Sequence, residues 1–399
     1  MEAKRKCVVC IGCGRCGAYR KDLQVITDSF LKSELLSADT ADKGSFVIVD
    51  IGTTTIAMEA YDSSGLKLAQ YVQANPQSVF GRDVISRIQA AENPIPAKQM
   101  QGLVKQVLRQ GLEELQRNIS DIEKIYVAGN TTMLYFLMGY DTNELGYAPF
   151  SASRLERAET SLGEWNMVCL PGFSAFVGAD IAAGVLATGM AEKESVSLLI
   201  DLGTNGEMVL GNGEKLLACA TAAGPAFEGV LEDGRQALWG ADLVKAVATL
   251  LDKGVLDETG LLAEPYFTEG VTIAGVCITQ NHIRNLQTAK AAIAAGIEML
   301  TKEYGIALTD IERVYLAGGF GYFLEEEAAV RIGLIPKELK GKVQAVGNSA
   351  LAGCYAYHFD GDAEEKIVRM KEKTRIINLA EEEGFAEDFI SQMNFSKES

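Results

Sequence analysis

Two short stretches of the chain combine an aspartate, a glycine and small polar side chains in the same order. Residues 50–55 are Asp-Ile-Gly-Thr-Thr-Thr, and about 150 residues later residues 201–207 are Asp-Leu-Gly-Thr-Asn-Gly-Glu. Each stretch follows an apolar, β-prone run and leads into a second one, so each predicts a hairpin turn between two strands. Glycine lets the backbone approach a ligand, and hydroxyl groups and turn amides can surround a phosphate. Two such turns predict two related lobes that bind one nucleotide from both sides.

Asp50 and Asp201 come at the ends of the first strands, where a carboxylate can hold the metal ion that neutralises a phosphate. A third stretch, residues 317–321, is Ala-Gly-Gly-Phe-Gly and ends a strand expected at 311–316. A diglycine there admits a flat ligand such as adenine, although by itself it is equally compatible with a tight turn. The residues predicted to contact the nucleotide are Gly52, Thr53, Thr54, Thr55, Gly203, Thr204, Asn205, Gly206, Gly318, Gly319 and Phe320.

Near the start of the chain, Cys7, Cys10, Cys13 and Cys16 form an unbroken Cys-x-x-Cys-x-x-Cys-x-x-Cys run. Disulfides at this spacing would be strained, so metal ligation explains the run better. Zinc sites usually separate two Cys-x-x-Cys pairs widely, whereas close spacing resembles the bacterial ferredoxin run around a [4Fe–4S] cluster. That run has a longer last gap and a proline after its fourth cysteine, where this chain has Gly17. The sequence predicts an iron–sulfur cluster with Cys16 as an open fourth ligand; zinc and no metal are the alternatives.

The composition restricts the class of protein. The 399 residues are 48% hydrophobic, which is enough for a large core in two or more domains. The net charge of −17 disfavours nucleic acid or an anionic membrane surface as the main partner. We find no secretory leader and no apolar run of about 18 residues, so we expect no membrane span. Eight cysteines in so long a chain, half of them in one run, indicate a reducing, cytoplasmic location.

Several expected elements would position the polar residues. A strand is expected over residues 122–127, and Asn130 lies among the small polar residues that follow it. Asn130 either contributes to the site or simply caps the following helix. Residues 181–190 predict a helix of small side chains that begins beside Asp180. Small side chains would let this helix approach a second one closely, as a hinge between lobes requires.

The chain divides by pattern into five parts. The predicted divisions are a cysteine-rich segment at 1–26, a linker at 27–44, lobe I at 45–195, lobe II at 196–358 and a charged helical surface tail at 359–399. Long helices are expected at 97–117 and 283–304, one in each lobe. The polar linker, if flexible, would reach roughly 23 Å.

The three nucleotide stretches come in the order of the phosphate 1, phosphate 2 and adenosine motifs of the actin, heat-shock-seventy and sugar-kinase superfamily. Within it, residues 129–134, 178–181 and 201–207 resemble the ATPase part of the reductive activators of corrinoid proteins. The resemblance covers roughly residues 45–358. It implies a two-lobed, actin-like (ribonuclease H-like) α/β ATPase behind a small cysteine-rich segment. It also implies that Asp180 helps to place the attacking water.

The resemblance further implies that the protein returns a Co(II) corrinoid to Co(I) with one electron from an iron–sulfur cluster, using ATP and Mg²⁺. The implied partners are a corrinoid protein of a methyltransferase system and an electron donor protein, and a homodimer is left open. Many relatives carry a plant-type [2Fe–2S] domain where this chain has only the short cysteine run. The chain lacks the Asp-x-His-x-x-Gly loop of base-off corrinoid binding, because Ala356 stands two residues before His358. The corrinoid would therefore belong to the partner.

Three other functions use the same superfamily fold. A small-molecule kinase could use Asp180 or Glu228 as its base, but it leaves the cysteine run unexplained. An activator of a radical 2-hydroxyacyl-CoA dehydratase would carry its cysteines within the ATPase lobes. A non-catalytic, actin-like assembly protein would need neither the cysteines nor the strong negative charge.

Overall fold

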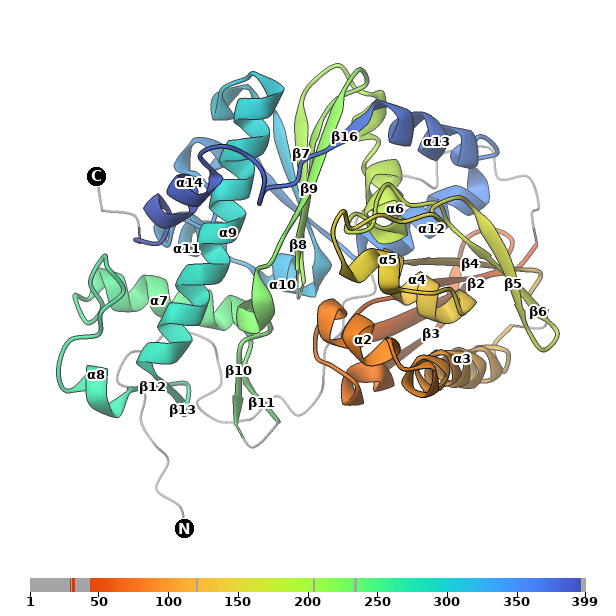
Figure 1. The fold of residues 1–399 in the computed structure, drawn as a ribbon, viewed down its shortest axis with the longest axis horizontal. Coiled ribbons are helices and arrows are strands. Elements are labelled where there is room, and N and C mark those ends of the chain that lie inside the picture. Colours follow the sequence, from red (N-terminus) through yellow and green to blue (C-terminus); the bar gives the residue numbers. More distant parts are fainter. Residues whose placement is uncertain are drawn as a thin grey trace, which may run out of the picture.

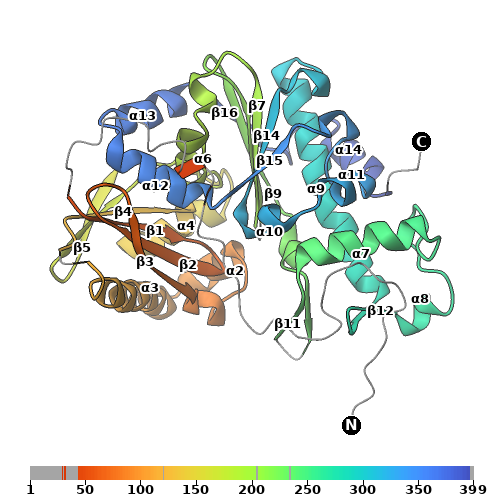
Figure 2. The ribbon, with the colours of Figure 1, turned by 180° about the vertical axis from the view of Figure 1, so that it is seen from behind.

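Two α/β lobes form the computed structural model, which describes residues 29, 31–32, 44–119, 121–203, 205–232 and 235–395. Each lobe contains a six-stranded sheet with helices packed on it, and Figures 1 and 2 show the lobes from opposite sides. This arrangement confirms the predicted two-lobed α/β fold. The predicted cysteine-rich segment lies outside the described residues.

The sheet of lobe I is built around β1 (Phe46–Ile51), in which every side chain except that of Asp50 is buried. Both faces of this strand are covered, which explains the continuous apolar run before the aspartate. β1 pairs antiparallel with one neighbour and parallel with the other. The strand order is β3 (Lys67–Ala74), β2 (Thr55–Tyr61), β1, β4 (Lys124–Gly129), β6 (Trp165–Cys169) and β5 (Ala158–Leu162).

The sheet of lobe II repeats the same plan around β7 (Ser197–Leu202), which also has one antiparallel and one parallel neighbour. Its strand order is β15 (Val343–Gly347), β14 (Arg313–Ala317), β7, β8 (Gly206–Gly211), β9 (Leu216–Thr221) and β16 (Thr374–Ile376). The repetition brings Asp50 and Asp201 to equivalent positions, each one residue before its strand ends. The structure thus confirms the two related hairpins expected from the sequence.

A long helix covers one face of each sheet. α3 (Pro94–Leu115) begins after Asn93, whose side chain accepts a hydrogen bond from the first turn, and its apolar stripe packs on the sheet of lobe I. α9 (Gln280–Tyr304) packs on the sheet of lobe II in the same way. Both helices confirm the expectations at 97–117 and 283–304, apart from a few residues at the ends.

Two inner helices pack against each other where the lobes meet, α6 (Ala179–Thr188) and α12 (Ser349–Phe359). A Cβ atom built on Gly353 would lie 2.2 Å from the carbonyl oxygen of Ala183, so only glycine permits this approach. The surrounding hydrophobic core includes Phe46 from lobe I and Leu199 from lobe II. The close helix contact predicted from the small side chains after Asp180 is therefore present.

No helix of the described residues combines the length and the apolar character that crossing a membrane requires. The remaining elements are shorter than α3 and α9. These elements are η1 (Pro76–Val79), α2 (Val84–Ala91), α4 (Thr131–Met138), α5 (Asn143–Gly146), η2 (Met190–Glu192), η3 (Gly224–Glu228), β10 (Val230–Glu232), β11 (Arg235–Leu238), α7 (Gly240–Asp252), α8 (Tyr266–Glu269), β12 (Val271–Ile273), β13 (Val276–Ile278), η4 (Leu308–Asp310), α10 (Gly318–Phe323), α11 (Glu326–Arg331), η5 (Lys337–Leu339), α13 (Ala363–Lys373) and α14 (Phe385–Ser391).

Two segments differ from the expectation of a linker and a surface tail. Leu31, inside the predicted linker, is buried in the core that the lobes share. In the predicted tail, Ile367 and Met370 of α13 are buried in that same core, β16 pairs with β9, and α14 packs on α9. The apolar residues of α13 follow a helical spacing, but the many charged residues between them hide this pattern in the sequence.

Candidate nucleotide site

Four carboxylates from the two lobes interact near the hairpin turns. Burial raises the pKa of Asp50 to about 6, although a hydrogen bond from Asn348 Nδ2 at 2.8 Å opposes the rise. Burial, and then the charge of Asp50, raises the pKa of Asp201 to about 7. Burial, followed by the charges of Asp50 and Asp201, raises the pKa of Asp180 to about 8. Burial and the charges of Asp180 and Asp201 also raise the pKa of Glu207, opposite Asp201 in the β7–β8 pair, well above its ordinary value.

Such a group of buried acids is unfavourable when ionised, unless a cation offsets the repulsion. Perturbed acids of this kind concentrate at functional sites. The structure therefore brings together Asp50, Asp180 and Asp201, which the sequence analysis singled out, and adds Glu207. The sequence offered a signal for Glu207, because it opens the second strand of the hairpin that Asp201 precedes.

The turn of lobe I is held by its carbonyl oxygens. The amide of Gly52 donates to Thr55 O at 2.9 Å. Asn75 donates twice, from its backbone to Thr54 O at 2.8 Å and from its side chain to Gly52 O at 2.9 Å. Because the C=O and the following N–H of a trans peptide point in opposite directions, the amides of Thr53 and Thr55 face away from Asn75. That orientation suits the binding of an anion by backbone amides.

Arg87 of α2 completes the support of this turn, and the sequence analysis did not identify it. Its guanidinium donates to Thr53 O at 2.7 Å and to Gly81 O at 2.9 Å, and the side chain is fully buried. Burial lowers its pKa to about 10, so it stays charged near neutral pH. No sequence motif marks this arginine, since its acceptors come from separate segments and include backbone atoms of Thr53 and Gly81.

Asn130 has both of the roles that its sequence position left open. Its Oδ1 accepts a hydrogen bond from Met133 N at 3.0 Å and caps α4. Its Nδ2 donates to Thr53 Oγ1 at 2.9 Å, which links the helix to the turn. The Thr53 side chain is therefore turned toward the protein, whereas Thr54 is exposed and Thr55 is half-buried. A contact between the three threonines and phosphate stays a prediction.

The turn of lobe II is one residue shorter. Gly203, which is exposed, donates to Asn205 O at 2.9 Å, and Thr204 lies outside the described residues. Packing explains why residue 206 is a glycine, because a Cβ there would lie 2.1 Å from Ile293 Cδ1 of α9. Glycine at this position thus brings the hairpin onto the helix, whatever it does for a ligand.

The diglycine stretch lies against one of these carboxylates, that of Asp201. Gly318 has a φ of +82°, and a Cβ on it would lie 2.9 Å from Asp201 Oδ1. The close backbone approach expected of this stretch is thus made to the aspartate. Gly319 is exposed, while the ring of Phe320 packs on Phe227 with centroids 4.8 Å apart. Phe320 accordingly contributes to the core of lobe II, and its contact with a nucleotide stays a prediction.

The donors suit Mg²⁺, which prefers oxygen ligands and usually keeps several waters beside one or two carboxylates and substrate phosphates. Among the described residues, no three His, Cys, Asp or Glu side chains converge closely enough to hold an ion directly. Asp50 and Asp201 fit the water-assisted mode, with the nucleotide supplying further oxygens. Cys7, Cys10, Cys13 and Cys16 lie outside the described residues, so the cluster they are predicted to hold stays a prediction.

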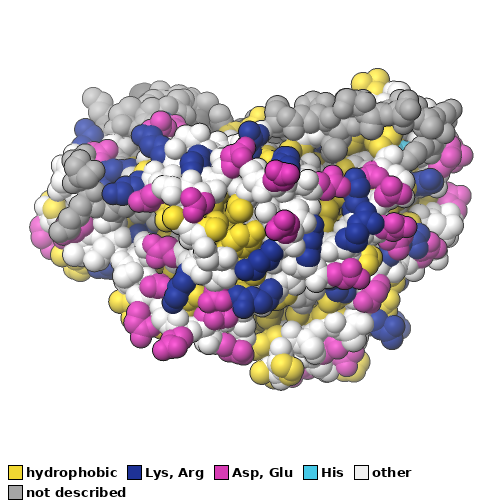
Figure 3. Space-filling model, turned by 90° about the horizontal axis from the view of Figure 1, so that it is seen from above, with side chains coloured by type: hydrophobic (Ala, Val, Ile, Leu, Met, Phe, Trp, Pro, Cys, Tyr) yellow, Lys and Arg dark blue, Asp and Glu magenta, His cyan; other side chains and the backbone are white. Residues whose placement is uncertain are grey.

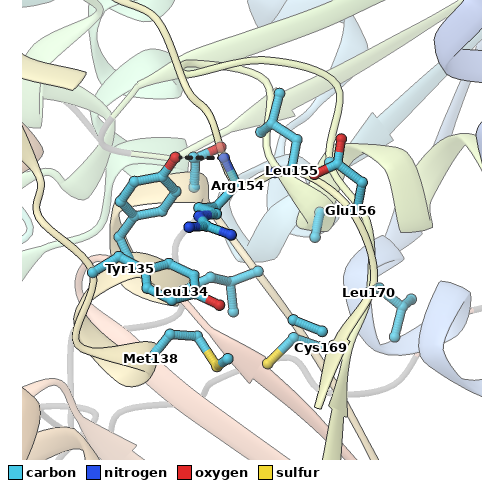
Figure 4. A pocket seen from close by; sticks show the side chains of 13 residues that line it. Leu134, Tyr135, Met138, Arg154, Leu155, Glu156, Cys169 and Leu170 are labelled. Carbon is cyan, nitrogen blue, oxygen red and sulfur yellow. Dashed lines mark hydrogen bonds between the residues drawn. The ribbon is translucent and has the colours of Figure 1, made fainter. Parts of the chain in front are cut away.

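A separate cavity lies in lobe I between α4 and the chain around β6 (Figure 4). Leu134 and Met138 of α4 line its apolar side with Cys169. At its polar side the Tyr135 hydroxyl accepts a hydrogen bond from Arg154 N at 2.9 Å. None of the predicted nucleotide residues lines this cavity.

Comparisons with known proteins cover both lobes. The family model "RACo middle region" matches residues 46–193, and "C-terminal domain of RACo the ASKHA domain" matches residues 195–241 and 231–399. The chain is 30% identical over 416 residues to the corrinoid activation enzyme RamQ of Eubacterium limosum, across 88% of this chain and 70% of RamQ. It is 24% identical over 371 residues to a Co(II) methylated amine-specific corrinoid protein reductase of Methanosarcina barkeri, across 77% of this chain and 68% of that protein.

A solved structure shares the fold. The reductive activator for a corrinoid, iron–sulfur protein superposes with a TM-score of 0.78 at 30% identity, across 90% of this chain and 67% of that one. Both family models, the relative RamQ and this solved structure match the chain over both of the lobes described above. The chain therefore belongs to the RACo family, the reductive activators of corrinoid proteins with an actin-like ASKHA domain.

Proposed function

We propose that this protein is an ATP-dependent reductive activator that returns the Co(II) corrinoid of a partner protein to Co(I). The observation that carries the proposal is the relationship to RamQ over both lobes, at 30% identity. The facing carboxylates of the two hairpins support it, because they suit one Mg–nucleotide held between the lobes. The reductase of Methanosarcina barkeri is likewise named for acting on a Co(II) corrinoid protein.

In this proposal the chain's own groups position the nucleotide and the water. The amides of the Gly52–Thr55 turn and of the Gly203–Gly206 turn bind the phosphates from opposite sides. Asp180, in the first turn of α6, orients the attacking water and accepts its proton, for which a raised pKa is suitable. The water oxygen forms the new bond to the γ-phosphorus, and the bond to the bridging oxygen of ADP breaks. Mg²⁺, when bound through Asp50 and Asp201, supplies the positive charge that offsets the phosphates.

The predicted cysteine run would hold an iron–sulfur cluster, whose chemistry is one-electron transfer. Such a cluster would supply one electron to Co(II), giving Co(I), and an electron donor protein would replace that electron. A gap of ~200 mV would cost about 5 kcal/mol for one electron. A ligand that binds one of two lobe arrangements preferentially can supply about that much. Because this chemistry needs ATP and a reducing environment, we place the protein in the cytoplasm.

The test mixes the full chain with candidate corrinoid proteins, a chemical reductant and Mg–ATP, and follows the cobalt spectrum. Co(I) should form with ATP in the wild-type protein and should not form with Asp201→Asn. Glu214→Gln removes an exposed carboxylate from the β8–β9 turn of the same lobe and should behave as wild type. Equal formation of Co(I) with and without ATP would refute the coupling.

A further inference from the structure

Ser29, Leu31 and Lys32 precede β1 and are buried, with exposed fractions of 9%, 3% and 9%. Burial of a lysine is unusual without a partner, because its charge must leave water. Leu31 belongs to the core that contains Phe46 of lobe I and Val346 of lobe II. The red ribbon of residues 31–32 is visible in Figure 2. This segment therefore has a fixed place on the ATPase.

On the side of lobe I, Lys32 forms an ion pair with Glu59 of β2, whose side chain is completely buried. The same carboxylate accepts a hydrogen bond from the Tyr61 hydroxyl at 2.5 Å and is paired with Lys67 Nζ at 3.2 Å. The Lys32 ammonium also lies 5.7 Å from the centre of the Tyr61 ring. Glu59 is thus a buried carboxylate that binds Lys32, and Lys67 of lobe I is a second cation on the same carboxylate.

On the side of lobe II, the Ser29 hydroxyl donates to the carbonyl oxygen of Val346 in β15. Two residues later Asn348 caps α12 and donates to Asp50, as described for the site. Ser29 therefore contacts β15, the strand that ends next to Asn348, and Asn348 in turn binds Asp50. Lys32, three residues further along the chain, contacts the other lobe.

We infer that Ser29, Leu31 and Lys32 form a clasp between the two lobes that is coupled to nucleotide binding. The clasp stabilises the arrangement in which Asp50 of lobe I and Asp201 of lobe II face each other. Because Mg–nucleotide needs that arrangement, nucleotide and clasp stabilise each other, and by reciprocity each strengthens the other by the same factor. The inference rests on the proposed function only in requiring that the lobes bind nucleotide.

The clasp also limits the position of the cysteine run. Ser29 lies thirteen positions after Cys16 in the sequence. At about 3.3–3.6 Å per residue they span at most roughly 45 Å. Chain length therefore keeps Cys16 within that distance of Ser29.

The test measures the affinity of the full chain for a non-hydrolysable ATP analogue with Mg²⁺. Ser29→Ala and Lys32→Met should each weaken binding roughly five-fold or more, the low end of measured couplings. Lys67→Met is the matched control: it removes the other cation of Glu59 without touching lobe II, and should change affinity less than about two-fold. Asp201→Asn should abolish Mg-dependent binding whether or not the clasp exists.

Hydrogen exchange of the wild-type protein provides a second measurement that needs no variant. Backbone amides of residues 29–32 should exchange more slowly, by a factor similar to the affinity change, when the analogue is bound. The clasp is refuted if Ser29→Ala and Lys32→Met bind the analogue like wild type, or if nucleotide leaves this exchange unchanged. A wild-type chain that binds no nucleotide would refute the proposed function together with the clasp.

Discussion

At the scale of single residues, the site depends on groups that hold the turn as much as on groups that face a ligand. Asn75, Arg87 and Asn130 bind atoms of the Gly52–Thr55 turn and so determine which way its amides point. Arg87 makes the most costly of these contacts, because a charged group is buried to make them.

Replacing Arg87 by Met should loosen the turn and weaken nucleotide binding. A hydrogen bond from a charged group is worth about 1.5–3 kcal/mol, so affinity should fall roughly ten-fold or more. Isothermal titration with Mg–ATP analogue measures the change, and urea unfolding reports any loss of stability. Arg82→Met, at an exposed position five residues earlier, should have little effect on either measurement. Unchanged nucleotide affinity in Arg87→Met would show that the turn does not need this support.

The carboxylate cluster should make stability depend on both pH and Mg²⁺. The raised pKa values of Asp50, Asp201 and Asp180 mean that the folded state holds more protons than the unfolded state between about pH 4 and pH 8. Stability without Mg²⁺ should therefore decline as the pH rises through this window. Adding Mg²⁺ should raise the thermal midpoint more at pH 8 than at pH 6, as differential scanning fluorimetry can record.

Asp180→Asn tests the same cluster from the other direction. It removes one buried charge, so the midpoint at pH 8 without Mg²⁺ should rise above that of wild type, while ATP hydrolysis is lost. Asp252→Asn replaces a half-exposed carboxylate that is outside the cluster and serves as the comparison. A fall in the midpoint of Asp180→Asn at pH 8 would contradict the repulsion described here.

The sequence could identify the acidic residues within a local motif. It could not identify the side chains from distant segments that bind the residues of that motif. Asp50 and Asp201 were singled out because each stands next to a strand end, and Asp180 because of the resemblance to the superfamily. Asn348 and Arg87 were not, since each meets its partner across a separation of 298 or 34 residues. Phe320 shows a different limit. The sequence predicted that it contacts a nucleotide, whereas in the fold its ring packs on Phe227.

At the scale of elements, the contact between α6 and α12 is the most demanding. The run of small residues after Asp180 predicted it, because helices with small side chains can approach closely. Its second helix could not be matched to the first from sequence alone, since pairing depends on how the two sheets are placed.

Gly353→Ala should disturb this contact strongly. The added methyl group would lie 2.2 Å from Ala183 O, and overpacking of this kind costs typically about 1–3 kcal/mol. Chemical denaturation measures the loss of stability. Nucleotide affinity should fall as well, because α6 carries Asp180 and α12 begins directly after Asn348. Gly102→Ala, in the open interior of α3, should instead be neutral or stabilise by up to about 1 kcal/mol. Equal stability of both variants would argue against a tight helix crossing.

At the scale of the whole molecule, the chain combines a repeated nucleotide-binding plan with segments that join its halves. The linker and the surface tail were predicted from their polar residues. Most of that linker lies outside the described residues, but Leu31 is buried, as are Ile367 and Met370 of the tail. Leu31 and Met370 each reach a core that contains residues of both lobes. On the face shown in Figure 3, basic and acidic side chains are interspersed, so the strong net charge does not collect in one field there.

The shared core has a consequence for how the protein comes apart. Residues of β1, β7, α6 and α12 pack in one cluster, and α13 crosses back onto it. Neither half could separate without exposing that apolar surface, so the halves should melt together. Calorimetry should record a single heat-absorption peak, and each half expressed alone should aggregate. Although its two halves repeat one plan, the chain behaves as one thermodynamic unit.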